Sequence, residues 1–378
     1  MDTINSRHPL DVARILSEYG QGFIDNHKLC PAQLKAFSAI LRCRTAAMGG
    51  HVEGCDHCGH QQVAYNSCRN RHCNKCQYIK QLKWVDQLQS KLPVCRYIHM
   101  VFTIPTALHK TFYINQRICY DVLFKAASLA LKKASQNPKF LGADTGAVAV
   151  LHTWGQALTY HPHIHMIIPA GGLSADGVEW VQAPRKFFLP VKALSKIFRG
   201  VMWALLEKQV ALNNIKLPGS VQLKRKLYEK NWNVFTCKSM AGPQSVLRYL
   251  GKYTHRVAID NSRLVAIDQG KVTFRWKDYR KGLQNMLLTL DAGEFIGRFL
   301  LHVLPSGFYK IRYYGILAAA NGNKRLQCVA LINHHPYVSL LQGLSSKQVV
   351  EMLTGKDPEL CPKCGKGKMM PYASLDST

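Results

Sequence analysis

Seven of the thirteen cysteines lie between Cys30 and Cys76, and they restrict how this part of the 378-residue chain can fold. Two CxxC pairs, Cys55–Cys58 and Cys73–Cys76, have fourteen residues between them. Each pair can bind one side of a tetrahedral zinc ion. Residues 49–78 are too few to bury a hydrophobic core, so we expect this segment to fold around structural zinc held by these four cysteines.

Other cysteines and histidines nearby allow a second zinc site. We expect that site to use Cys43, His51, Cys68 and His72, although the two histidines could instead face a nucleic acid. A third CxxC pair near the end of the sequence has no second pair beside it. It could recruit Cys328, His334 or His335, or it could hold no metal; its members are Cys361 and Cys364.

The charge of the chain indicates a polyanionic partner. There are 50 Lys and Arg residues against 22 Asp and Glu, a formal net charge of +28, and nucleic acid is the first candidate. A run of about 18 apolar residues, which a membrane-spanning helix needs, does not occur. The N-terminus lacks the apolar core of a secretory signal. We therefore expect a cytoplasmic protein that does not associate with a membrane, in which cysteines bind metal rather than form disulfides.

The apolar pattern predicts a mixture of helices and strands without strict alternation, which favours an α+β fold with an antiparallel sheet. Helices are expected at 7–48, 79–92, 112–134, 189–209, 245–256 and 294–304, and strands at 97–104, 146–156, 163–169 and 272–276. We divide the chain into a helical and zinc-binding DNA-docking domain (1–95), a larger second domain (96–330) and a C-terminal tail (331–378).

Two histidines in the second domain form a candidate metal site. On a strand, His163 and His165 point to the same face while Ile164 points into the core. The preceding strand would fold back beside them, so that Gln156 or His152 could complete a site with three ligands; we favour Gln156, which lies nearer the turn. Such a site suits magnesium or manganese holding a phosphate, and also zinc.

Two tyrosines form the second candidate element. Tyr249 and Tyr253 are four residues apart, so on a helix both phenols lie on one face. They could simply pack on a core. Next to a metal site, however, a tyrosine oxygen can attack a phosphodiester while cations offset the developing charge. The cations of the same segment are Arg248, Lys252 and Arg256.

These motifs resemble the two-tyrosine HUH transposases of rolling-circle insertion sequences, the IS91 family. The resemblance covers His163-Ile-His165, the Tyr-x-x-x-Tyr motif at Tyr249, the CxxC region and the run from His302 to Phe308. It implies an HUH endonuclease domain, an antiparallel sheet flanked by helices, with a small zinc-ribbon-like domain before it. It also implies a catalytic magnesium or manganese ion on His163 and His165.

By this resemblance, the chain would nick and rejoin single-stranded DNA at transposon ends and target by tyrosine attack, in a bacterial cytoplasm at the nucleoid. A 5′-phosphotyrosine intermediate conserves the bond energy, and no GxxxxGK[ST] loop occurs in the chain. Arg69, Arg71 and Lys75 would contact DNA phosphates. The alternatives are a plasmid relaxase or rolling-circle replication initiator, and a non-catalytic zinc-ribbon nucleic-acid-binding protein. Oligomeric state remains open.

Overall fold

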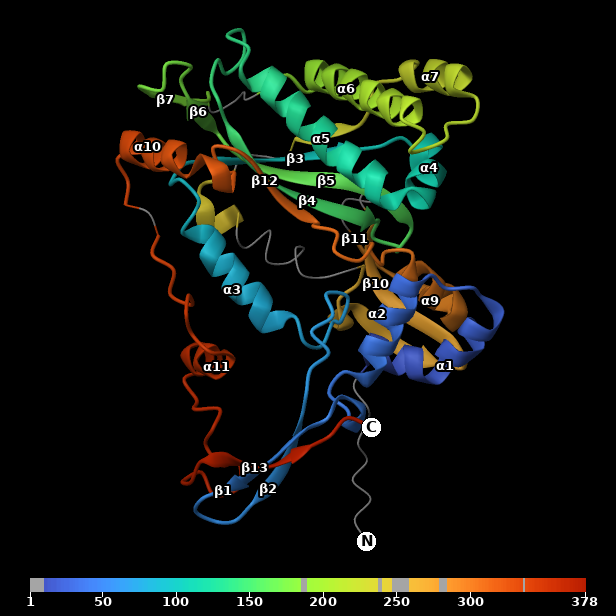
Figure 1. Ribbon diagram of the computed structural model, residues 1–378, viewed down its shortest axis with the longest axis vertical. Coiled ribbons are helices and arrows are strands. Elements are labelled where there is room, and N and C mark those ends of the chain that lie inside the picture. Colours follow the sequence, from blue (N-terminus) through green and yellow to red (C-terminus); the bar gives the residue numbers. More distant parts are fainter. Residues whose placement is uncertain (1–9, 185–188, 237–239, 247–257, 279–283, 336) are drawn as a thin grey trace.

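A five-stranded antiparallel sheet lies at the centre of the computed structural model (Figure 1). The structure describes residues 10–184, 189–236, 240–246, 258–278, 284–335 and 337–378. The strand order is β12 (Ile311–Gly315), β4 (Gly146–Trp154), β5 (Tyr160–Pro169), β3 (Tyr97–Thr103) and β8 (Val234–Thr236). The predicted α+β class and antiparallel sheet are thus confirmed, and β5, which carries the two predicted histidines, is the middle strand.

Helices cover one face of this sheet and bury its apolar side chains. The alternate residues Ile164, Met166 and Ile168 of β5 enter the largest core, as the period of two predicts. The covering helices are α4 (His109–Ile114), α5 (Gln116–Ser135), α6 (Val191–Ala211) and α7 (Ser220–Tyr228). The opposite face is packed at one end by α3 (Tyr78–Gln89) and the segment after it. The two predicted histidines, His163 and His165, lie toward the other end of that face.

A smaller lobe combines helices from the first predicted domain with strands and a helix from the second. Its three-stranded sheet has the order β11 (Gln284–Asp291), β10 (Lys271–Asp278) and β9 (Leu264–Asp268), and α9 (Ala292–Leu300) follows it. Helices α1 (Val12–Asn26) and α2 (Pro31–Arg42) share one buried cluster with this lobe. The single helical region expected at 7–48 is therefore two helices, and Pro31 begins the second because its ring suits the first turn.

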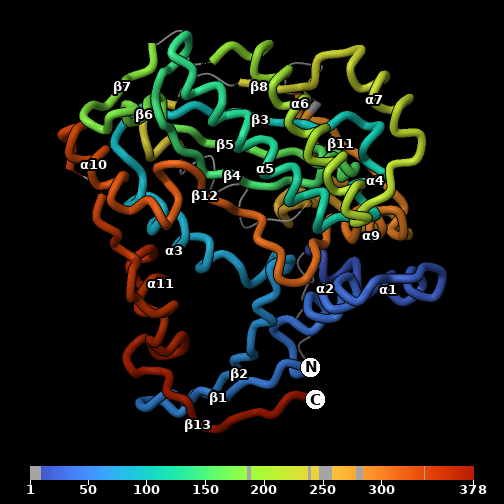
Figure 2. Tube along the Cα trace, turned by 45° about the horizontal axis from the view of Figure 1, so that its top comes forward, coloured from blue at the N-terminus to red at the C-terminus, as the bar shows by residue number. Residues whose placement is uncertain are grey.

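The cysteine-rich region forms a long hairpin, to which the end of the chain adds a third strand. Strand β1 (Gly50–Cys55) pairs with both β2 (Gln61–Tyr65) and β13 (Met369–Leu375), all antiparallel. Helices α10 (Gly322–Ile332) and α11 (Ser346–Thr354) lie along the path from the central sheet to this hairpin (Figure 2). Within the segment 331–378, β13 is thus the part that pairs with this hairpin.

Two short strands, β6 (Gly171–Leu173) and β7 (Trp180–Gln182), complete the strands of the described residues. Among the helices that the structure describes, none has the length and apolar character needed to cross a bilayer.

Candidate active site and metal centres

Three histidines come together on the face of the central sheet opposite α5 and α6. His152 of β4 lies directly opposite His163 of β5, and His165 follows two residues later on the same face. One ring nitrogen from each of the three lies within 4.8 Å of the others. The alternation of both strands produces this cluster, because the residues between the histidines, such as Ile164, point into the core on the other face.

Hydrogen bonds determine which ring nitrogen of His163 can bind a metal. Its Nδ1 lies 2.6 Å from the carbonyl oxygen of His161, and a carbonyl can only accept. Nδ1–H is therefore the donor, and the lone pair of the neutral ring is on Nε2. A second hydrogen bond of this kind orients many metal-binding histidines.

Burial keeps the rings of His163 and His165 neutral. It lowers the pKa of His163 to about 4 and that of His165 well below its ordinary value, with a further contribution to His165 from His152 and His163. At neutral pH each of these two rings therefore offers a lone pair without first losing a proton. Three imidazoles facing one another form a donor set that fits a divalent metal ion.

A fourth histidine, which the sequence interpretation missed, supports this cluster. His99 of β3 is buried, stacks on His165 with ring centroids 5.0 Å apart, and its Nε2 lies 2.8 Å from Nδ1 of His165. Its position on a predicted strand, two residues after the buried Tyr97, was the available signal, since Tyr97 and His99 share a face.

Gln156, which we favoured as the third ligand, lies beyond the strand that carries His152. Strand β4 ends at Trp154, and its register with β5 shifts between His152 and Trp154, so the alternation does not continue to residue 156. Gln156 lies in the turn beyond, where its backbone oxygen accepts a 2.6 Å hydrogen bond from Arg263. The alternative, His152, is the residue that the structure brings beside His163 and His165.

Gln156 also lines a pocket of about 280 Å³ beside the cluster. The pocket has two indole rings and several cations in its wall, including Trp154, Trp276 and Arg275. Trp154 connects the two places, because its ring stacks on His152 with centroids 4.7 Å apart. Aromatic and cationic side chains together are typical of surfaces that bind unpaired nucleotides.

Tyr249 and Tyr253 lie outside the described residues, together with Arg248, Lys252 and Arg256. The nearest described residues before and after this segment are Val246 and Ala258. Val246 belongs to one buried cluster with Val150 and Ile167, which lie on the histidine face of the sheet. After the tyrosines, Ala258 lines the same pocket as Trp154.

Four cysteine thiols form a cluster at the base of the hairpin. Cys43 follows α2, and Cys68, Cys73 and Cys76 lie between β2 and α3; all four Sγ atoms are within 4.8 Å of one another. The Sγ atoms of Cys68 and Cys76 are 3.7 Å apart. A hydrogen bond with Cys68 lowers the pKa of Cys43 to about 7, toward the thiolate that zinc requires.

The predicted grouping of the zinc ligands was wrong. Cys55 and Cys58 do not join Cys73 and Cys76, because β1 separates them along the hairpin. Six residues of extended chain span roughly 20 Å, far more than one zinc ion can bridge. The structure instead brings Cys361 and Cys364 to Cys55 and Cys58, and neither Cys328 nor the pair His334 and His335 belongs to that group.

The two histidines of the predicted second site are engaged elsewhere. Nε2 of His51 lies 3.1 Å from Oε1 of Glu53. His72 is buried, its Nε2 accepts from the backbone N–H of Leu304, and its Nδ1 donates to Oδ1 of Asn70. Burial lowers the pKa of His72 to about 3, so it is a neutral structural residue.

The three N-terminal cations expected on DNA differ in their surroundings. Arg69 is exposed. Arg71 is half-buried and donates to the backbone oxygen of Phe308, and burial lowers its pKa. Lys75 forms a 3.0 Å ion pair with Asp11. Arg69 therefore has the surroundings of a phosphate contact, whereas Arg71 and Lys75 join the zinc region to the rest of the protein.

Two family models match parts of the chain. Residues 146–325 match a family model described as "Putative transposase", and residues 15–104 match one described as "Transposase zinc-binding domain". The chain is 43% identical over 383 residues to "Putative transposase y4qJ" of Sinorhizobium fredii, covering 97% of this chain and 96% of that protein.

A second relative is more distant. The chain is 28% identical over 302 residues to "Transposase for insertion sequence element IS801" of Pseudomonas savastanoi pv. phaseolicola, covering 76% of this chain and 70% of the relative. No solved structure matches the chain. The first family match contains all three clustered histidines, and the second contains the four cysteines at the base of the hairpin.

Proposed function

Because the chain belongs to the IS91 family of transposases, we propose that it cuts and rejoins single-stranded DNA at the ends of an insertion sequence, with a tyrosine as the nucleophile. The observation that carries the proposal is the cluster of His152, His163 and His165 on one face of the central sheet. It is a site for a divalent metal ion inside the transposase match, in a chain with a net charge of +28.

In the proposed reaction, the phenol oxygen of Tyr249 or Tyr253 attacks the scissile phosphorus. A bond forms between this oxygen and the phosphorus, and the bond from phosphorus to the 3′ oxygen breaks. The phenol releases its proton to solvent, the 3′ oxygen leaves as a hydroxyl after taking up a proton from solvent, and the 5′ end remains on the tyrosine. A bound magnesium or manganese ion would polarise the phosphate. Two tyrosines allow two such steps, one at each end of the element.

The chain's own residues would position the strand. His163 and His165 each place a ring nitrogen within 4.8 Å of the other's and of one from His152. Next to them, Trp154 and Trp276 can stack on unpaired bases, while Arg275 offsets phosphate charge. Val246, which precedes the tyrosines in the sequence, packs on the histidine face of the sheet, and Ala258, which follows them, lines the pocket beside Trp154.

The reaction can be tested with a labelled single-stranded oligonucleotide that carries the end of the element, in buffer containing manganese. We expect an adduct of protein and DNA that survives denaturation, together with a free 3′ end. Tyr249→Phe combined with Tyr253→Phe removes both nucleophiles and should abolish the adduct. Tyr309→Phe, an exposed tyrosine outside the site, is the matched control and should leave it unchanged.

Two results would contradict the proposal. One is the absence of any covalent adduct with the unmodified chain. The other is an adduct that persists in the double variant, since the attacking group would then be a different residue. A zinc-binding protein without catalytic activity would bind the oligonucleotide and give neither product.

A further inference from the structure

A second group of four thiols joins the two ends of the chain. Cys55 and Cys58 lie at the end of β1 and in the turn that follows, and Cys361 and Cys364 precede β13. We propose that these four cysteines bind a second zinc ion and that this ion fastens the C-terminal segment to the N-terminal hairpin. The family match to a zinc-binding domain ends at residue 104 and includes only two of the four.

The spacing of the sulfur atoms fits a shared zinc ion. Sγ of Cys55 is 3.8 Å from Sγ of Cys364, and Sγ of Cys58 is 3.7 Å from Sγ of Cys361. All four sulfur atoms lie within 4.8 Å of one another. A tetrahedral zinc ion with Zn–S bonds of 2.3 Å separates its ligands by about 3.8 Å. A disulfide would need a distance of about 2.05 Å.

The two CxxC pairs have the same local backbone. After each pair a glycine has positive φ, +66° at Gly59 and +63° at Gly365. The N–H of Gly59 donates to the oxygen of Cys55, and the N–H of Gly365 donates to the oxygen of Cys361, at 3.2 and 2.9 Å. These are the tight turns that let two thiols three residues apart face one metal ion.

Backbone N–H groups also point at the sulfur atoms. The N–H of Cys58 lies 3.4 Å from Sγ of Cys55, and the N–H of Gly367 lies 3.4 Å from Sγ of Cys364. Hydrogen bonds to metal ligands hold those ligands in the orientation that the metal requires. A Cβ at Gly367 would lie 2.6 Å from Sγ of Cys55, so the tail approaches the hairpin as closely as a glycine allows.

Contacts that need no metal bring the same segments together. Strand β13 pairs with β1 from Gly50↔Leu375 to Cys55↔Met369, with one irregularity. Oδ1 of Asp56 accepts from the N–H of Lys368 at 2.8 Å. Cys361 and Cys364 are therefore held opposite Cys55 and Cys58 by a paired strand, and their proximity does not depend on four isolated side chains.

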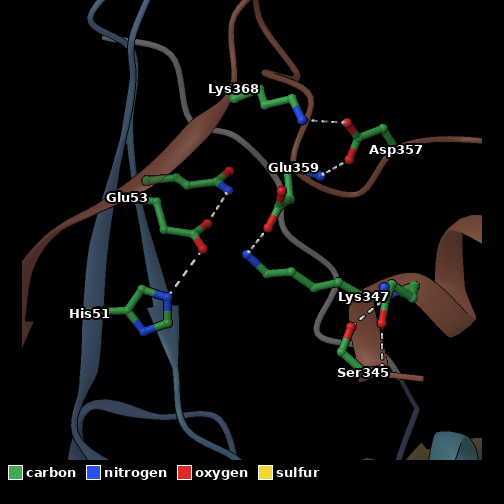
Figure 3. A network of polar contacts seen from close by, with 9 residues as sticks. His51, Glu53, Ser345, Lys347, Asp357, Glu359 and Lys368 are labelled. Carbon is green, nitrogen blue, oxygen red and sulfur yellow. Dashed lines mark hydrogen bonds and ion pairs between the residues drawn. The ribbon is translucent and has the colours of Figure 1, made fainter. Parts of the chain in front are cut away.

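A network of charges beside the sheet adds to this contact (Figure 3). Lys347 of α11 forms a 2.8 Å ion pair with Glu359, and Lys368 forms one of 3.7 Å with Asp357. On β1, Oε1 of Glu53 lies 3.1 Å from Nε2 of His51, and Oε2 of Glu53 accepts a 3.0 Å hydrogen bond from the side-chain amide of Gln62.

The zinc content of the full chain tests the proposal. Variants that lack one pair, Cys361→Ser with Cys364→Ser or Cys55→Ser with Cys58→Ser, should each contain about one zinc ion fewer per chain than the unmodified protein. The variant with all four substitutions should lose no more than either, because both pairs serve one ion. Cys30→Ser changes an exposed cysteine outside the clusters and should lose none.

Mass spectrometry of the metal would give these ratios, and cobalt substitution would report the number of thiolates from the charge-transfer absorption. Limited proteolysis supplies a second readout: fragments containing β13 should separate from the hairpin in the variants and stay bound in the control. Cys364→His retains a ligand and should keep the ion with weaker thiolate absorption, which separates loss of the site from loss of the fold.

Unchanged zinc content without Cys361 and Cys364 would overturn the proposal. So would losses from the two pairs that add together in the fourfold variant, because each pair would then hold its own ion with other ligands.

Discussion

The imidazole of His165 is linked to that of His99 by the 2.8 Å contact between Nδ1 of His165 and Nε2 of His99. One of these two nitrogens must carry the proton. If Nδ1–H of His165 donates, the lone pair of His165 is on Nε2 and can bind a metal. Nε2 of His99 must then be the acceptor, so the proton of the neutral His99 ring is on Nδ1. His99 therefore acts as a positioning residue for the proposed site.

We expect His99→Leu to weaken manganese binding about 10- to 100-fold, as loss of such a partner usually does. His99→Gln should retain most of the affinity, because its amide oxygen can accept from Nδ1–H of His165. Titration calorimetry on the folded variants measures this. Equal losses in the two variants would show that His99 contributes packing rather than a hydrogen bond.

At the scale of the elements, β4 and β5 determine the donor set. Their register puts His152 opposite His163 and leaves Gln156 in the turn, so the proposed ligands are three nitrogens without an amide oxygen. Magnesium prefers oxygen ligands, whereas manganese accepts nitrogen ligands more readily than magnesium does. The arrangement of these two strands thus favours manganese over magnesium.

We expect His152→Ala to weaken manganese binding at least about 10-fold, because it removes a ligand, and Gln156→Ala to leave it nearly unchanged. Manganese should also support cleavage at lower concentration than magnesium. Calorimetry and cleavage assays across both metals check this pair of expectations. Stronger dependence on Gln156 than on His152 would restore the ligand set favoured from the sequence.

Much of the fold could be predicted because it depends on local periodicity. The pattern of two along β5 and the helical pattern of α6 are local, and both elements lie within a few residues of the expected ranges. The single helix expected at 112–134 is instead α4 and α5, which are separated at Asn115. The partner of each CxxC pair depends on which strands meet, which spacing does not encode. Cys361 lies 303 residues after Cys58, and only the pairing of β13 with β1 brings them together.

At the scale of the whole molecule, buried neutral histidines join the lobes. His302 follows α9, its Nε2–H donates to the backbone oxygen of Leu158, and its Nδ1 accepts from Thr153. Nearby, His72 accepts from the backbone of Leu304. The run from His302 to Phe308, which the sequence singled out, is therefore the joint between the small lobe, the zinc region and the central sheet.

This joint should make the fold sensitive to acid. Burial lowers the pKa of His302 to about 4 and that of His72 to about 3, against about 6.5 in an unfolded chain. Above pH 6.5 both histidines are neutral in the folded and in the unfolded state, so they do not lower the free energy of unfolding. Between about pH 6.5 and 4 these histidines bind protons in the unfolded chain but stay neutral in the folded chain. Each residue should then cost up to about 1.4 kcal/mol per pH unit.

Thermal unfolding from neutral to acidic pH measures the slope. His302→Gln should be less steep than the unmodified chain, because one such residue is gone. His335→Gln, at an exposed position outside the joint, should not change it. Identical slopes in all three proteins would assign the acid sensitivity to other groups.

The position of β1 between β2 and β13 has a consequence for the order of synthesis. Its second partner strand is made about 300 residues later. At 5–20 residues per second, a ribosome needs roughly 15–60 s for that distance. During this interval the hairpin has one open edge and two thiols without their partners, both accessible to oxidants and to stray metals. The three-stranded sheet of β2, β1 and β13 therefore cannot be completed until the chain between β2 and β13 has been synthesised.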